Sequence, residues 1–134
     1  MHNKLTATII NYFDSRQEVV AVYLFGSHAS GKEHGSSDID LGVLLNRNDP
    51  LGERRNKFLV DLTRALNKDV HLTILNTAGE ELMRQIYKKG ICLLVNDPRK
   101  LTLFNMVMYA KIADFSFYRR RMRTGFVKSL MAEG

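Results

Sequence analysis

The segment VVAVYLFGSHASGKEHGSSDIDLGVLL, residues 19–45, decides the fold of this chain. It begins with a continuous apolar run, Val19 to Phe25, which has the length and the β-branched and aromatic content of a buried strand. A glycine and a serine then break the run. A polar stretch of ten residues leads to two aspartates separated by one residue, and a second apolar run follows them. The segment therefore predicts two neighbouring strands joined by a polar loop.

The glycine–serine turn after the first strand suits a phosphate group. Gly26 lets the backbone turn sharply and approach a ligand closely, and Ser27 adds a hydroxyl group beside the backbone N–H groups. Residues 28–37 are polar and rich in glycine, and we expect them to start as a short helix whose N-terminus supports phosphates. We interpret His28 and His34 as solvated loop residues. Taken alone, a glycine–serine pair is usually only a turn.

Asp38 and Asp40 are two residues apart on an extended segment, so both carboxylates point to the same face. The alternating residues Ile39, Leu41 and Val43 then face the core. Two neighbouring carboxylates repel each other unless a cation lies between them, and hard oxygen ligands beside a phosphate site suit Mg²⁺. An isolated Asp-x-Asp is usually a solvated strand edge or loop. Together with the preceding turn, however, the pair predicts binding of Mg²⁺ with a nucleoside triphosphate.

The order of these parts resembles the signature of the polymerase-β-type nucleotidyltransferases, in particular the minimal MNT proteins encoded beside HEPN toxins: Gly26-Ser27, ten residues, then Asp38-Ile39-Asp40. The resemblance covers most of the chain and is strongest at residues 22–45. It implies an α/β (α+β) fold of the polymerase-β-like nucleotidyltransferase type, with a mixed β-sheet flanked by helices and a long C-terminal helix.

The resemblance also implies a function. An MNT-type antitoxin transfers AMP from Mg²⁺-ATP to a tyrosine of its cognate HEPN ribonuclease toxin and so neutralises it. On this basis Asp38 and Asp40 are expected to be catalytic and to bind the metal, and Gly26 and Ser27 to bind the nucleotide. Binding itself also contributes to neutralisation.

A third catalytic position is altered in this chain. Related enzymes usually carry a third carboxylate on the third strand, and His71 stands at the matching position of Val70-His71-Leu72. Imidazole accepts a proton near pH 7 but is a poorer Mg²⁺ ligand than a carboxylate. We therefore name His71 as the third candidate catalytic residue. Asp69, two residues earlier, is the alternative if the strand register shifts.

Three other functions stay open at this point. His71 favours a catalytically impaired antitoxin that acts by binding alone. A transferase for a small molecule is disfavoured, because the chain has no room for a separate substrate-recognition domain. A nucleic-acid-binding module leaves Asp38 and Asp40 unexplained, because carboxylates repel phosphates unless a metal intervenes. We accordingly expect no direct binding of nucleic acid.

Length and composition limit the remaining possibilities. A chain of 134 residues indicates one domain, which we place at residues 1–134 as a single nucleotidyltransferase domain. The single cysteine, Cys92, excludes a disulfide framework within the chain and agrees with a reducing compartment. We expect it in the core, within a buried strand at residues 91–95. The sequence shows no secretory leader and no apolar run of membrane-spanning length, so we expect a soluble cytoplasmic protein.

Apolar periodicity predicts further helices at residues 3–14, 51–67 and 77–89 and a third strand at 69–75. Asp97-Pro98 begins a long final helix, to about residue 132, by placing a cap before a proline in the first turn. That helix carries an apolar stripe which we assign to the core: Leu103, Met106, Val107, Ala110, Ala113 and Phe117.

The net charge of +6 comes from this last helix. Residues 1–97 hold 12 Lys and Arg against 12 Asp and Glu, whereas residues 98–134 hold 8 against 2. Its end is either a solvated helix terminus, where cations are favourable, or a docking surface for an acidic partner or for nucleic acid. The cluster in question consists of Arg119, Arg120, Arg121 and Arg123.

Overall fold

The computed structural model describes residues 2–31 and 38–133, with side chains at 4–31, 38–114 and 120. The fold is α+β, as the sequence predicted. Its elements follow in the order α1 (His2–Asp14), β1 (Val19–Phe25), α2 (Ser27–Ser30), β2 (Ile39–Leu45), α3 (Glu53–Leu66), β3 (Val70–Ile74), the 3₁₀ turn η1 (Leu75–Thr77), α4 (Glu80–Lys89), β4 (Ile91–Val95) and α5 (Pro98–Glu133).

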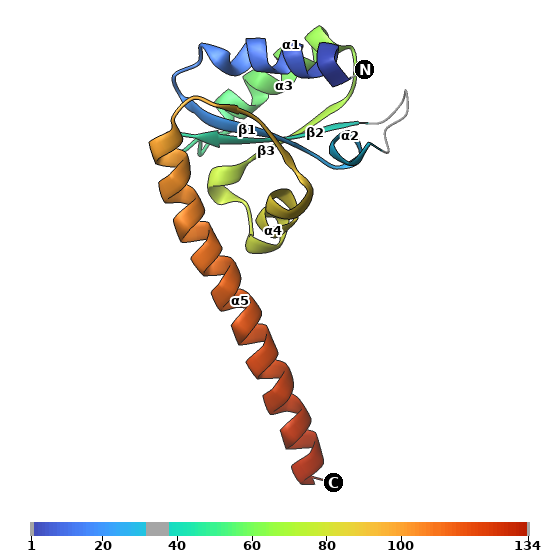
Figure 1. Cartoon of the computed structure of the whole chain (residues 1–134), viewed down its shortest axis with the longest axis vertical. Coiled ribbons are helices and arrows are strands. Elements are labelled where there is room, and N and C mark those ends of the chain that lie inside the picture. Colours follow the sequence, from blue (N-terminus) through green and yellow to red (C-terminus); the bar gives the residue numbers. More distant parts are fainter. Residues whose placement is uncertain (1, 32–37, 134) are drawn as a thin grey trace.

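The strands of the described residues form one mixed sheet in the order β3-β2-β1-β4. β1 runs antiparallel to both β2 and β4, whereas β2 and β3 are parallel. Helices cover both faces: α1 and α3 lie on one side, and α4 and the first part of α5 lie on the other (Figure 1). This mixed topology places the end of β1 beside the beginnings of β2 and β3.

Alternate residues of the central strands enter two separate cores. Ile39, Leu41 and Val43 are fully buried against α1 and α3, as predicted. The opposite face of the sheet packs on α4 and α5, with Tyr23 and Leu44 among its buried members. Because both faces are covered, β1 and β2 are apolar almost throughout, which explains the uninterrupted apolar run that opened the sequence.

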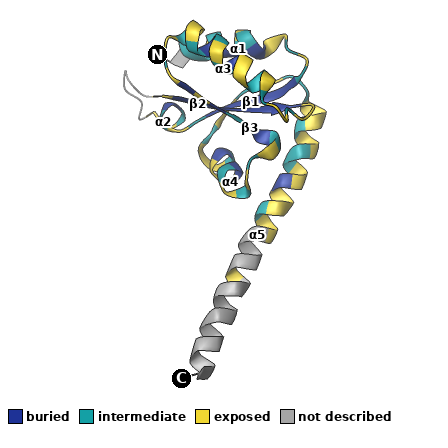
Figure 2. Cartoon of the chain, turned by 180° about the vertical axis from the view of Figure 1, so that it is seen from behind, coloured by how far each residue is buried: buried dark blue, intermediate teal, exposed yellow. Residues whose placement is uncertain are grey.

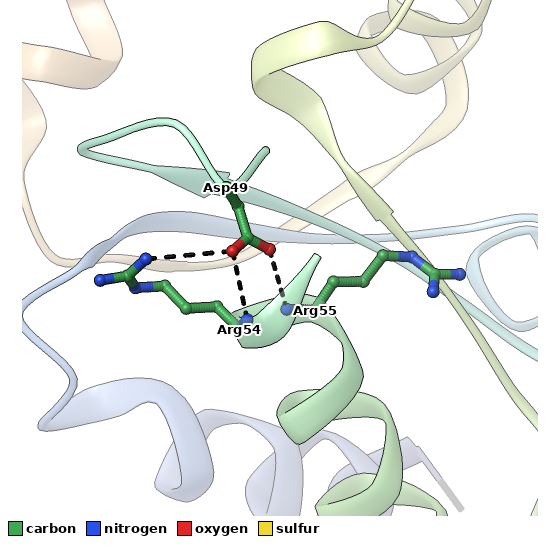
Figure 3. A network of polar contacts seen from close by, with 3 residues as sticks. All are labelled: Asp49, Arg54 and Arg55. Atoms are coloured by element: carbon green, nitrogen blue, oxygen red, sulfur yellow. Dashed lines mark hydrogen bonds and ion pairs between the residues drawn. The ribbon is translucent and has the colours of Figure 1, made fainter. Parts of the chain in front are cut away.

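The start of α3 is determined by Asp49. Its two carboxylate oxygens accept backbone N–H bonds from Arg54 and Arg55, at 3.2 and 3.1 Å (Figure 3). These bonds satisfy N–H groups that the first turn of a helix leaves without intrahelical partners. The Arg55 side chain points away from Asp49 (Figure 3), and its Nε donates to the carbonyl of Leu72 at 2.8 Å. This bond ties α3 to β3.

The prediction that β4 is a buried strand is wrong. β4 pairs with β1 at the edge of the sheet, and Ile91 and Val95 are exposed. Cys92 is likewise an exposed free thiol and does not fill the core. A short apolar run is typical of a buried strand, but its place in the sheet depends on which strands pair, and the run itself does not encode that pairing.

The face assigned to the core on the final helix is also wrong. Leu103, Met106 and Val107 are more than half exposed, at 57%, 63% and 56%, and Ala110 and Ala113 are exposed as well. The side chain of Phe117 lies outside the described residues. The helix packs on the domain through the opposite face: Leu101, Phe104, Met108 and Ile112. Both faces are apolar, so periodicity finds the helix without showing which face is packed.

None of the helices in the described parts of the chain combines the length and apolar character needed to cross a lipid bilayer.

Candidate functional site

Three neighbouring strands bring the predicted site residues together at one end of the sheet, where β1 ends and β2 and β3 begin. Phe25, the last residue of β1, lies opposite Asp40 in β2, so Gly26 follows beside that carboxylate. In the parallel pair of β2 and β3, Asp40 lies opposite His71. Asp38 immediately precedes β2. The residues that the sequence singled out are therefore neighbours, although 45 positions separate the first from the last.

His71 and Asp38 are in direct contact. Their atoms Nε2 and Oδ2 are 2.8 Å apart, and both side chains are exposed. A carboxylate can only accept a hydrogen bond, so we assign the proton of neutral His71 to Nε2, which leaves Nδ1 as the acceptor of the ring. Asp69 contributes its backbone carbonyl to Ile39 N–H at 3.0 Å. The observed register thus places His71, and not Asp69, beside Asp40.

Asp40 is a carboxylate in an unfavourable setting for its charge. Partial burial raises its pKa above the ordinary value, and the neighbouring negative charge of Asp38 raises it further. The nearby imidazoles of His71 and His28 act in the opposite direction. Because desolvation and a like charge both penalise the ionised form, a cation bound between Asp38 and Asp40 would relieve both penalties.

The backbone at Gly26 requires glycine. Its dihedral angles are φ 73° and ψ −151°, a region that other residues enter only with strain. A Cβ atom built on Gly26 would overlap Oδ2 of Asp40. The absence of a side chain therefore has a specific consequence, because it lets the turn after β1 pass directly against the carboxylate of Asp40.

The predicted helix after the turn is present as a single turn, α2, which begins at Ser27. Ser30 N–H bonds the carbonyl of Gly26 at 3.2 Å and so closes this turn on the glycine. The interpretation of His28 as a solvated residue is wrong, because it is only 4% exposed. The α2 turn directs its side chain inward, near enough to Asp40 to influence the pKa of that carboxyl. His34 lies outside the described residues.

The donor set fits a cation that binds together with a phosphate ligand. Among the side chains that the structure describes, at residues 4–31, 38–114 and 120, there is no group of three or more His, Cys, Asp or Glu suited to holding a metal. The site instead offers the two carboxylates of Asp38 and Asp40. Mg²⁺ commonly binds through one or two carboxylates and completes its coordination with water and substrate phosphates. The arrangement therefore fits Mg²⁺ carried with a nucleotide.

The arginine cluster is not part of the candidate site. The end of α5 lies far from β2 and α2 (Figure 1). Arg120 is exposed there, and the side chains of Arg119, Arg121 and Arg123 lie outside the described residues. Any role of the cluster is accordingly separate from the chemistry at the candidate site.

A hollow of about 760 Å³ lies at the carboxyl ends of β2 and β3, opposite to Asp38, Asp40 and His71 along these strands. No motif in the sequence pointed to it, because its lining comes from connections between elements. It contains none of the predicted site residues. Its lining is Asn48, Asp49, Pro50, Leu51, Gly52, Arg55, Leu72, Thr73, Ile74, Asn76, Thr77 and Ala78.

Comparison with known proteins agrees with this geometry. The family model described as polymerase beta, nucleotidyltransferase, matches residues 7–99, a range that contains Gly26, Ser27, Asp38, Asp40 and His71. The chain is 36% identical over 78 residues to the protein adenylyltransferase MntA of Shewanella oneidensis. The aligned segment covers 58% of this chain and 55% of that protein. The chain thus spans about half the length of this curated relative.

Solved structures share the fold. A chain in the crystal structure of a toxin–antitoxin complex with AMP-PNP superposes with a TM-score of 0.68 at 26% identity, covering 94% of this chain and 98% of that chain. A chain in the complex of a tri-AMPylated Shewanella oneidensis HEPN toxin with its MNT antitoxin gives 0.65 at 23% identity, over 98% and 99% of the two chains. At that identity the second likeness concerns the fold alone.

Proposed function

Because this chain belongs to the polymerase beta nucleotidyltransferase family, we propose that it is an antitoxin which transfers AMP from Mg²⁺-ATP to a tyrosine of a HEPN ribonuclease toxin. The similarity to a protein adenylyltransferase supports the reaction. The likeness to a chain of a toxin–antitoxin complex with AMP-PNP supports both the nucleotide and the class of partner. The observation that carries the proposal is the meeting of Gly26, Asp38, Asp40 and His71 at one end of the sheet.

The residues of the candidate site have distinct roles in the proposed reaction. Asp38 and Asp40 would hold Mg²⁺, which when bound supplies positive charge against the triphosphate and the charge that develops on it. Gly26 and Ser27 bind the β- and γ-phosphates. The missing side chain of Gly26 leaves room for a phosphate close to the backbone, beside the carboxylate of Asp40.

The transfer itself is an in-line displacement. The tyrosine hydroxyl oxygen forms a bond to the α-phosphorus, and the bond from that phosphorus to the oxygen bridging to the β-phosphate breaks. Pyrophosphate leaves with the electron pair. His71 accepts the hydroxyl proton at Nδ1, while Asp38 keeps the ring oriented through its contact with Nε2. The toxin gains AMP and loses one proton.

A binding-only antitoxin is the second candidate, and one observation favours it. His71 occupies the place of a third carboxylate, and it engages Oδ2 of Asp38, an oxygen that a cation would otherwise use. Such a protein neutralises its toxin without modifying it. The two candidates share the fold and the partner, and they differ in whether AMP appears on the toxin.

The test of the site is the double variant Asp38→Asn with Asp40→Asn. Wild-type protein should bind ATP more tightly with Mg²⁺ than with EDTA, and the variant should lose this difference while remaining folded, as measured by calorimetry and circular dichroism. Asp14→Asn with Asp114→Asn is the matched control, since both residues are exposed and lie outside the site. Equal Mg²⁺ dependence in wild type and site variant would remove the metal site from the proposal.

The test of the reaction is mass spectrometry of a candidate HEPN toxin, after incubation with this protein and Mg²⁺-ATP. Added AMP on a tyrosine supports the transferase. Tight binding without added AMP supports the binding-only antitoxin.

We assign the arginine cluster to docking of the same partner. Surface charges act mainly by steering association, so reversal of Arg119, Arg120, Arg121 and Arg123 to glutamate should slow association and weaken its salt dependence. Unchanged association rates at low salt would leave the cluster as a solvated helix end.

A further inference from the structure

The first half of α5 carries a second apolar face that the domain does not cover. Leu103, Met106 and Val107 are 57%, 63% and 56% exposed, and Ala110 continues the same face. We call these four residues the outer seam. The opposite face of the helix already packs on the domain, with Met108 buried beneath it, so the outer seam is not part of the protein's own core (Figure 2). Contiguous apolar residues left exposed in this way mark a site of interaction.

The spacing within the outer seam indicates the shape of its occupant. Leu103, Met106 and Ala110 follow intervals of three and four residues, and Ala113 adds the next interval of three. Side chains at this alternation form one seam along a helix, which packs knobs-into-holes against a second helix. The two alanines leave room for a close approach of the other backbone. The seam therefore fits a helix better than a strand or an irregular loop.

Charge distinguishes a foreign helix from a second copy of this chain. Arg99, Lys100 and Lys111 lie on the same stretch of α5 and are exposed, against the single acidic residue Asp114 among described positions 98–114. Over residues 98–134 the sequence holds 8 basic and 2 acidic residues. Two copies of α5 placed side by side would bring like charges together, whereas an acidic helix would be attracted.

We propose that the outer seam docks an amphipathic helix of the partner protein whose flanks are acidic. This inference rests on the proposed function, since the partner is the HEPN toxin named above. Apolar contact along the seam gives affinity, and the surrounding lysines and arginines orient the acidic flanks. The seam lies on the part of α5 packed against the domain, so the docked helix is held on a rigid support.

The experiment compares two exposed valines on different helices. Val107 lies in the outer seam, and Val60, 47% exposed, lies on α3 at the other face of the sheet. Val107→Glu should weaken binding to the HEPN toxin of the proposed function by about tenfold or more, as for a central interface residue. Val60→Glu, the same substitution, should change the dissociation constant less than about twofold. Val107→Lys should weaken binding less than Val107→Glu, because an acidic partner attracts the lysine. Thermal unfolding confirms that each variant is folded.

The outcomes separate the seam from the function. If wild type binds the toxin and Val107→Glu binds it as tightly as Val60→Glu does, the seam proposal is overturned and the proposed function stands. If wild type does not bind the toxin, the proposed partner is wrong and the seam proposal fails with it. If light scattering shows a wild-type dimer that Val107→Glu converts to a monomer, the occupant is a second copy and the proposal is overturned.

Discussion

Replacing Gly26 with alanine should weaken ligand binding in this protein while the domain remains folded. Gly26 has φ 73° and ψ −151°, and the space where a Cβ would stand is occupied by Oδ2 of Asp40. Alanine therefore meets two obstacles, a strained backbone and a displaced carboxylate. Because Asp40 is proposed to hold Mg²⁺ with the nucleotide, the second obstacle acts directly on the site.

The expected magnitudes follow from these two obstacles. A residue with a side chain in this backbone region costs about 1–3 kcal/mol of the free energy of unfolding. Shifting a group that positions a metal ligand typically lowers metal affinity by about 10–100-fold. We therefore expect Gly26→Ala to remain folded at room temperature, since a domain of this size is commonly stable by about 5–15 kcal/mol, and to bind Mg²⁺-ATP about 10–100-fold more weakly.

Gly52→Ala is the matched control. Gly52 also has a positive φ, 69°, but a Cβ there would meet no atom within 4 Å, and it lies at the start of α3 at the other end of the sheet. It should lose about 1–2 kcal/mol of stability from the backbone alone. Urea unfolding measures the stability of both variants, and calorimetry measures ATP binding with Mg²⁺. Wild-type affinity in Gly26→Ala, or an equal loss in Gly52→Ala, would refute this account of the turn.

Two further predictions concern the third strand and alkaline pH. His71→Asp, which introduces a third carboxylate beside Asp40, should raise AMP transfer without changing toxin binding, whereas His71→Ala should lower transfer by about 10²–10⁴-fold. Equal transfer in all three proteins would make His71 an ordinary strand side chain. Burial raises the pKa of Tyr23 to about 12, so its phenol keeps the proton in the folded state after the unfolded chain has lost it. Tyr23 should therefore contribute a fall in the free energy of unfolding of up to about 1.4 kcal/mol per pH unit from roughly pH 10 to pH 12. Tyr12 and Tyr87, whose pKa values burial also raises, add to the total slope, and Tyr23→Phe should remove only the Tyr23 contribution in denaturant titrations.

Much of the candidate site was predictable because it is encoded locally. Asp38 immediately precedes β2 and Asp40 is the second residue of that strand, so the two-residue spacing keeps them together, and Gly26 ends the preceding apolar run. The identification of His71 depended on a family pattern, and the parallel register of β2 and β3 now places it beside Asp40. Its contact with Asp38 was not predictable, because it joins residues 33 positions apart.

The errors share one cause. His28 lies in a polar stretch, yet the α2 turn buries it. Cys92 lies in an apolar run, yet its strand forms an edge of the sheet and leaves it exposed. In both cases the composition of the segment was read correctly, and the burial depended on neighbours far away in the chain.

The sequence by itself determined the order of helices and strands, the residues of the candidate site motif and the concentration of positive charge in the last helix. These properties follow from side-chain periodicity, turn chemistry and composition, which act over a few residues. Only the tertiary structure decided the strand order β3-β2-β1-β4 and the face of α5 that packs on the domain. Because α5 is apolar on both sides, hydrophobic burial favours either face equally in the isolated helix. The surface offered by α4 and the sheet selects one face and leaves Leu103, Met106 and Val107 exposed to solvent.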